Sequence, residues 1–138
     1  MQKNIDTGSL TKKAAILASV TAIAVALLDG GFKFLAIRNL PSDSLPLSWP
    51  FALALHKNPG IIFDIAIPLG VILPITVMLC TALLVIIKKN IHTSLAQSTG
   101  LWLIVCGAVG NAVDRVVNGF TTDYIIIFQR SAINLADI

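Results

Sequence analysis

Asp123 and Asp137, near the end of the chain, are the side chains best suited to chemistry. Both follow a long apolar run and neither has a helical partner in sequence, so the fold must bring them together. Two close carboxyl groups cannot both ionise cheaply, so one pKa rises and a proton is shared. The ionised group is then a general base for water, and the protonated group is a general acid that polarises a carbonyl. This pair makes proteolysis beside a membrane the leading hypothesis.

A polar stripe precedes the pair, on a segment that is otherwise apolar. Residues three and four apart share one face of a helix. On that face Gly107 would admit a close neighbouring helix, and Asn111 could form a hydrogen bond across a bundle. Arg115 carries five donors that can hold carboxylates in a fixed orientation. Asp114 is expected to be structural, and a structural role for the whole stripe is the alternative.

A second charged pair lies in the first apolar run. Asp29 and Lys33 are spaced i, i+4, so they share a helix face. One interpretation is a structural ion pair that makes two charges tolerable near lipid headgroups. The other is a supporting role in a site, since charge inside a membrane segment is expensive and usually functional.

Composition places all these residues in a membrane protein. Charged residues make up 12% of the chain and the mean hydropathy is +0.86, whereas soluble domains carry about 25% charged residues. The net charge of +3 does not indicate nucleic-acid binding, because the lysines flank apolar segments instead of forming a stripe. We expect one all-α membrane domain with spans at about residues 14–37, 61–87 and 94–117, each near the roughly 20 residues that crossing requires.

The paired lysines also predict orientation. Lys12-Lys13 and Lys88-Lys89 abut the spans, so the positive-inside rule places the N-terminus in the cytoplasm. The polar residues of the spans and of the connecting segments then gather at the outer side. Residues 51–56 and 123–128 are strand-like, and we expect them to pair in a small extracytoplasmic sheet beside the site.

Two other kinds of site find little support. Asp6-Thr7-Gly8-Ser9 spells the active-site loop of soluble aspartic peptidases, but here it follows a polar tail and is expected to be coincidental. His56 and His92 are expected on opposite sides of the membrane, and no His/Cys cluster has metal-ligand spacing. We therefore expect neither a metal nor a cofactor.

Five short motifs, in order, resemble those of the lipoprotein signal peptidases (signal peptidase II), which are bacterial membrane aspartic peptidases. Leu28–Lys33 is similar to L-D-x-x-x-K, and Lys57–Phe63 to N-x-G-x-A-F. Gly107–Arg115 resembles G-x-x-x-N-x-x-D-R. Asp123-Tyr124 stands where V-D-F/Y is expected, and Asn134–Asp137 where N-x-A-D is expected. The resemblance covers the chain from the first span to its end.

The resemblance implies a fold, a reaction and residue roles. The fold would be a four-helix membrane bundle with a small extracytoplasmic β element, in the bacterial cytoplasmic membrane. The reaction would be cleavage of prolipoproteins before their diacylglyceryl-modified cysteine, among membrane lipids and without a metal, with Asp123 and Asp137 as the catalytic pair. The supporting residues would be Asn111, Asp114, Arg115, Asn134, Asp29, Lys33, Asn58 and Gly60.

The sequence also departs from the family pattern. Pro59 and Ile62 replace the usual Thr and Ala, Thr122 replaces the usual Val, and Asp64 is an added carboxylate of unassigned role. The chain ends one residue after Asp137, where the fourth helix would begin. We therefore expect a truncated domain, residues 1–138, with weak or no activity by itself. The alternatives are an inactive fragment of the peptidase and a non-catalytic membrane subunit for assembly or transport.

Overall fold

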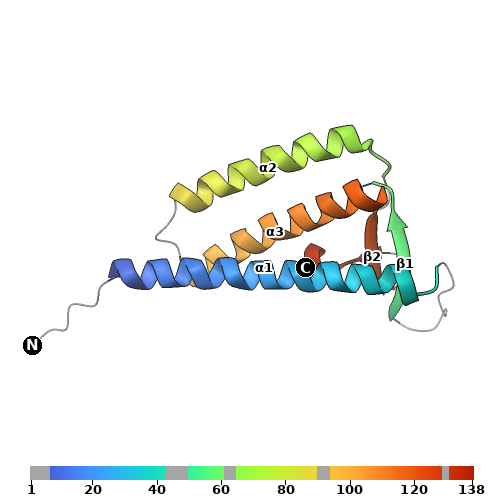
Figure 1. The fold of residues 1–138 in the computed structure, drawn as a ribbon, viewed down its shortest axis with the longest axis horizontal. Helices are drawn as coiled ribbons and strands as arrows, with labels where there is room; N and C mark the ends of the chain where they lie inside the picture. The colour runs from blue at the N-terminus through green and yellow to red at the C-terminus, as the bar shows by residue number, and fades with distance from the viewer. Residues whose placement is uncertain (1–6, 43–49, 61–64, 90–93, 129–130) are drawn as a thin grey trace, which may run out of the picture.

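Three long helices and a small sheet make up the fold. The computed structural model describes residues 7–42, 50–60, 65–89, 94–128 and 131–138. The helices are α1 (Thr7–Asn39), α2 (Leu69–Lys89) and α3 (Leu95–Asn118), and the sheet lies across one end of them (Figure 1). In the described part of the chain, the segments Lys12–Asn39, Leu69–Lys89 and Leu95–Asn118 are long and apolar enough to cross a membrane. The predicted helical membrane class is confirmed.

The start of α2 differs from the prediction. We expected the second span from residue 61, but the helix begins at Leu69, directly after Pro68. Pro68 suits a helix start because its missing N–H is not needed there, and its carbonyl accepts hydrogen bonds from the N–H groups of Val71 and Ile72 (2.8 and 3.2 Å). Residues 61–64, including Asp64, lie outside the described part of the chain. Pro74 lies inside α2, as membrane helices tolerate.

Small residues let α1 approach α3 closely. Ala18 and Ala22 are fully buried and Ala36 nearly so, and they fall on the same face of α1 as Asp29 and Lys33. In a membrane, small interfacial residues allow helix backbones to pack at short distance. One stripe of α1 therefore carries both the packing residues and the buried charges. It places those charges against α3, the helix with the other polar stripe.

The sheet confirms the predicted strand pairing. Its strands are β1 (Phe51–Asn58), β2 (Thr121–Ile127) and β3 (Ser131–Ile133), antiparallel in the order β1-β2-β3. Between Leu53 and His56 the register shifts, so that His56 lies opposite Asp123; this is the extra residue of a β-bulge. A short 3₁₀ helix, η2 (Leu135–Asp137), follows β3 and carries Asp137 back onto α3, with which η2 makes contacts.

A candidate active site at the end of the helices

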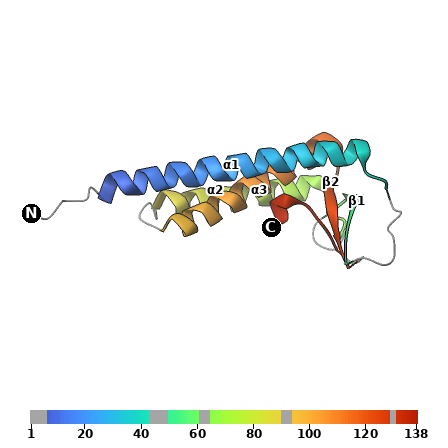
Figure 2. The same ribbon diagram turned by 90° about the horizontal axis from the view of Figure 1, so that it is seen from below.

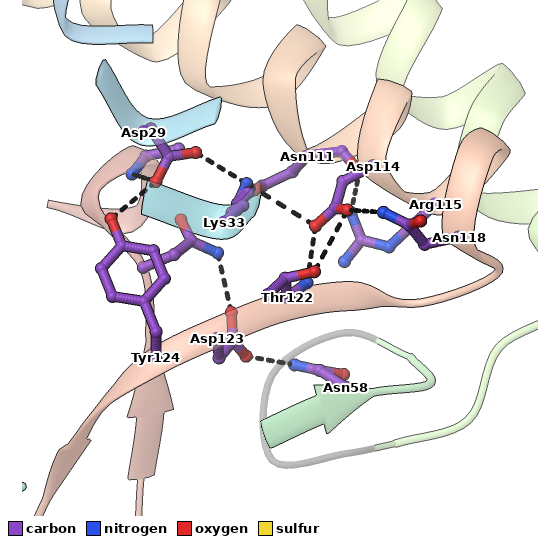
Figure 3. A network of polar contacts seen from close by, with 12 residues as sticks. Asp29, Lys33, Asn58, Asn111, Asp114, Arg115, Asn118, Thr122, Asp123 and Tyr124 are labelled. Carbon is purple, nitrogen blue, oxygen red and sulfur yellow. Dashed lines mark hydrogen bonds and ion pairs between the residues drawn. The ribbon is translucent and has the colours of Figure 1, made fainter. Parts of the chain in front are cut away.

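Asp123 lies on β2, and its side chain is almost wholly buried. Only 1% of its surface is exposed. Its carboxylate accepts hydrogen bonds from the side-chain amides of Asn134 (2.7 Å) and Asn58 (3.2 Å; Figure 3). Burial raises the pKa of Asp123 to about 6, against the opposing effect of these two amides. The negative charge of Asp137 contributes a smaller part of this rise, as expected for a carboxylate that lies near a second carboxyl group.

Asp137, at the end of η2, is exposed, whereas Asp123 is buried. One of its carboxylate oxygens accepts a hydrogen bond from the side-chain amide of Asn111 (2.9 Å), and the other from the backbone N–H of Asn134 (3.1 Å). Asn134 therefore contacts both carboxyl groups, one through its side chain and one through its backbone. Its own side-chain oxygen is buried and has no partner among the described residues.

Asp29 links the segment that carries Asp123 to the segment that carries Asp137. One oxygen of its carboxylate accepts hydrogen bonds from the hydroxyl of Tyr124 (3.0 Å) and from the backbone N–H groups of Leu135 and Ala136 (3.0 and 3.3 Å). Burial raises the pKa of Tyr124, so its hydroxyl stays a donor. Asp29 thus holds the residue after Asp123 and the two residues before Asp137. This is a larger role than the ion pair predicted from the sequence.

Lys33 joins α1 to the polar stripe of α3. Its ammonium group forms an ion pair with Asp29 (2.7 Å), donates a hydrogen bond to the side-chain oxygen of Asn111, and lies 3.9 Å from Asp114 (Figure 3). Both Asp29 and Lys33 are buried. The predicted Asp29–Lys33 pair is therefore confirmed, and its cation is shared with two residues of α3.

Asp114 sets the start of β2. Its carboxylate accepts hydrogen bonds from the backbone N–H and the hydroxyl of Thr122 (2.6 and 3.2 Å) and from the side-chain amide of Asn118 (2.6 Å). These contacts fix the residue directly before Asp123. They agree with the structural role expected for Asp114.

Arg115 and Gly60 close the other side of the site. The guanidinium of Arg115 donates to the carbonyl of Gly60 (2.8 Å), and the N–H of Gly60 donates to the side-chain oxygen of Asn58 (2.9 Å). A Cβ at Gly60 would lie 1.8 Å from the backbone oxygen of Ile65, so only glycine fits. Arg115 therefore orients Asp123 indirectly, through Gly60 and Asn58, and not by the direct contact with carboxylates that its donors led us to expect.

All sequence-predicted site residues described above belong to one connected set of polar contacts. The sequence did not predict Thr122 or Tyr124 as part of it. Tyr124 sits in an apolar strand and contacts Asp29, a residue far away in sequence, so no local spacing could reveal its role. The available signal was its place in the motif that Asp123-Tyr124 resembles.

Gly107 has a different neighbour from the one predicted. We expected a close helix, but a Cβ at Gly107 would lie 2.6 Å from the backbone oxygen of Ala136, in η2. Because Gly107 has no side chain, the 3₁₀ turn that ends in Asp137 has room to lie against α3.

Gly107→Ala should displace this turn and lower activity more than stability. The added methyl group would push Ala136, and with it Asp137, and catalytic groups must be held within about 0.5 Å. A 1 Å misplacement costs about 10²-fold in rate. The matched control is Gly110→Ala on the same helix, where an added Cβ meets nothing within 4 Å. Comparable activity of the two variants would show that the turn is not held at Gly107.

Comparisons with known proteins identify the family of this chain. Residues 21–138 match the family described as signal peptidase (SPase) II. The lipoprotein signal peptidase of Bartonella tribocorum is 31% identical over 137 residues, which cover 93% of this chain and 81% of that protein. The lipoprotein signal peptidase of Brucella ovis is 29% identical, with 91% of this chain and 84% of that protein covered.

Two solved structures of bacterial membrane enzymes share the fold. The first has a TM-score of 0.76 at 23% sequence identity and covers 89% of this chain and 77% of that one. The second has a TM-score of 0.72 at 25% identity and covers 89% and 82%. Fold, motif order and family match coincide over nearly the whole chain, and the chain belongs to the signal peptidase II family of bacterial membrane aspartic peptidases.

Proposed function

We propose that this chain removes signal peptides from diacylglyceryl-modified prolipoproteins, with Asp123 and Asp137 as the catalytic pair. The observation that carries the proposal is their shared contact with Asn134 in unlike surroundings. Asp123 is buried and has a raised pKa, whereas Asp137 is exposed and is held by two N–H donors. Two carboxyl groups whose environments differ in this way are suited to opposite roles, acid and base.

The asymmetry assigns those roles. Asp123, protonated, donates to the scissile carbonyl oxygen and polarises it, while Asp137, ionised, takes a proton from water. The resulting hydroxide adds to the carbonyl carbon and gives a tetrahedral diol. The C–N bond then breaks as Asp137 returns its proton to the leaving nitrogen and Asp123 recovers the proton from the diol. The products are the signal peptide with a free carboxylate and a lipoprotein with a new amino terminus.

Asn134 is suited to hold the water. Its side-chain oxygen is buried without a partner among the described residues, and a buried acceptor without a donor costs free energy. The attacking water, bound at this oxygen, would supply that donor. Asn134 would then hold both carboxyl groups, through its side-chain amide and its backbone N–H, together with the water.

The pH dependence of cleavage tests these roles. We expect kcat/KM to fall as the pH rises above about 6, because Asp123 must be protonated to act as the acid and its pKa is raised to about 6. This descending limb of the pH profile reflects the coupled carboxyl groups of Asp123 and Asp137, and not one residue alone. The Asn58 hydrogen bond favours ionised Asp123, so Asn58→Leu should move this limb to higher pH.

The measurement is initial cleavage rate of a diacylglyceryl-modified prolipoprotein in detergent across the pH range where the protein stays folded. A rate that rises through pH 6 and stays high would contradict protonated Asp123 as the acid. An Asn58→Leu limb at lower pH than that of the unsubstituted protein would contradict the proposed effect of the amide.

The site should face the outside of the cytoplasmic membrane. The polar network lies where α1 and α3 end beside the sheet, whereas Lys88 and Lys89 lie in the last turn of α2 at the opposite end (Figure 1). The positive-inside rule assigns the lysine end to the cytoplasm.

Cysteine labelling checks this orientation. In a variant without Cys80 and Cys106, a membrane-impermeant thiol reagent added to intact cells should modify Lys57→Cys and spare Lys89→Cys. Both should react after the membrane is opened. If the reagent modifies Lys89→Cys and spares Lys57→Cys in intact cells, the orientation is the opposite of the one proposed.

A further inference from the structure

Three apolar side chains at the far end of the sheet are largely exposed. Phe51 is 63% exposed, Leu53 65% and Phe128 66%, although Ala54, Leu55 and Ile126 of the same sheet are buried. The rings of Phe51 and Phe128 pair with their centroids 6.1 Å apart. Phe51 and Leu53 lie two residues apart on β1, so they share a face. We call Phe51, Leu53 and Phe128 the sheet tip.

The backbone at the sheet tip is strained. Phe128 has φ of 48°, and among the described residues it is the one non-glycine with a positive φ. A bulky residue in that region is uncommon, and a glycine or asparagine would adopt it more readily. The N–H of Phe128 donates to the carbonyl of Pro50 (2.8 Å) and holds this conformation. The turn therefore keeps an aromatic ring exposed at a backbone cost.

The position of the sheet tip determines what it meets. The sheet lies across the end of the membrane helices (Figure 1), and its strands extend sideways beyond them (Figure 2). β2 begins at Thr121, just after α3 ends at Asn118, so the sheet lies at the level where the spans leave the bilayer. A projection at this level and beyond the helices overhangs the surrounding lipid.

Apolar surface on the helices reaches the same level. Near the end of α1, Phe34 and Leu35 are 53% and 52% exposed, as expected for side chains that face lipid. Aromatic side chains concentrate at the boundary between headgroups and acyl chains, and a contiguous exposed apolar patch marks an interaction surface. Contact with lipid accounts for the exposure of both the sheet tip and this end of α1.

We propose that the sheet tip is an interfacial anchor, whose partner is the lipid surface of the leaflet at the sheet end. Phe51, Leu53 and Phe128 lie among the headgroups and upper acyl chains. The same strand, β2, carries Asp123 and leads to Phe128, so this contact fixes the depth of Asp123 relative to the membrane. The anchor does not depend on the proposed cleavage reaction.

Tryptophan fluorescence in nanodiscs tests the anchor. The two native tryptophans, Trp49 and Trp102, are replaced by phenylalanine, and Phe51→Trp is introduced as the probe. The matched control is Lys57→Trp, exposed on the same strand at its other end. Each is measured in discs of phosphatidylcholine with and without brominated acyl chains, which quench tryptophan at the acyl level, and with aqueous iodide.

Phe51→Trp should emit at shorter wavelength than Lys57→Trp, be quenched more strongly by brominated lipid, and be protected from iodide. Phe128→Trp provides a second probe and should behave like Phe51→Trp. Equal iodide quenching of the Phe51 and Lys57 probes would overturn the proposal. Protection that is lost in discs holding a single copy of the chain would also overturn it, because it would identify a second copy, and not lipid, as the partner.

Discussion

Asp123→Asn and Asp137→Asn should each abolish measurable cleavage of a diacylglyceryl-modified prolipoprotein by the protein expressed from its complete coding sequence. Asparagine has nearly the shape of aspartate, but it can neither share a proton with the other carboxyl group nor accept one from water. Loss of a general acid or base typically costs about 10²–10⁴-fold in rate. The measurement is turnover per folded protein, at matched expression and matched substrate.

Asp114→Asn is the informative control for this pair. Asp114 accepts three hydrogen bonds from Thr122 and Asn118 but forms no hydrogen bond with Asp123 or Asp137 in the described structure. Its substitution should therefore lower stability more than the turnover of the folded fraction. Persistent turnover by either Asp123→Asn or Asp137→Asn would favour a different catalytic group, whereas no turnover by the unsubstituted protein would favour the non-catalytic alternative.

Lys33→Met should cause the largest loss of stability among single changes at the site. Lys33 is 4% exposed and Asp29 is 1% exposed, and Lys33 is the cation closest to Asp29 and Asp114 in the ion pairs of the described residues. Removing one partner of a buried ion pair costs about 3–5 kcal/mol, because a charge is left uncompensated. The measurement is the free energy of unfolding, or the midpoint of thermal unfolding, in detergent.

A double variant separates the charge from the packing. Adding Asp29→Asn to Lys33→Met removes the uncompensated carboxylate, while the asparagine oxygen can still accept hydrogen bonds from Tyr124 and from the backbone of η2. The double variant should therefore be more stable than Lys33→Met alone. If the double variant is less stable than Lys33→Met by the full effect of Asp29→Asn, the two residues are not energetically coupled.

The sequence predicted the elements whose signals are local. Apolar length identified the three spans, and the β-branched and aromatic residues at 51–56 and 123–128 identified the two strands that pair. The start of α2 was misjudged because the apolar residues before Pro68 look like membrane span, and the proline decides where the helix begins. β3 was missed because Ser131–Ile133 is too short to show an alternating pattern.

The site residues were predicted by type, but their contacts were not. Asp29 was expected to pair with Lys33 four residues away, and the structure adds Tyr124, Leu135 and Ala136. These partners come from the other end of the chain, so periodicity contains no information about them. The neighbour of Gly107 was misassigned for the same reason: a glycine in a helix shows that something approaches closely, but not which element it is.

Cleavage of a lipid-modified substrate, with the new amino terminus identified by mass spectrometry, tests the central claim most directly. The protein is expressed from its complete coding sequence, reconstituted in lipid with a chelator present, and given a prolipoprotein with and without the diacylglyceryl group. We expect cleavage of the modified form alone, directly before the modified cysteine, and no cleavage by Asp123→Asn. Equal cleavage of the unmodified form, cleavage elsewhere, or cleavage lost on chelation would contradict the account.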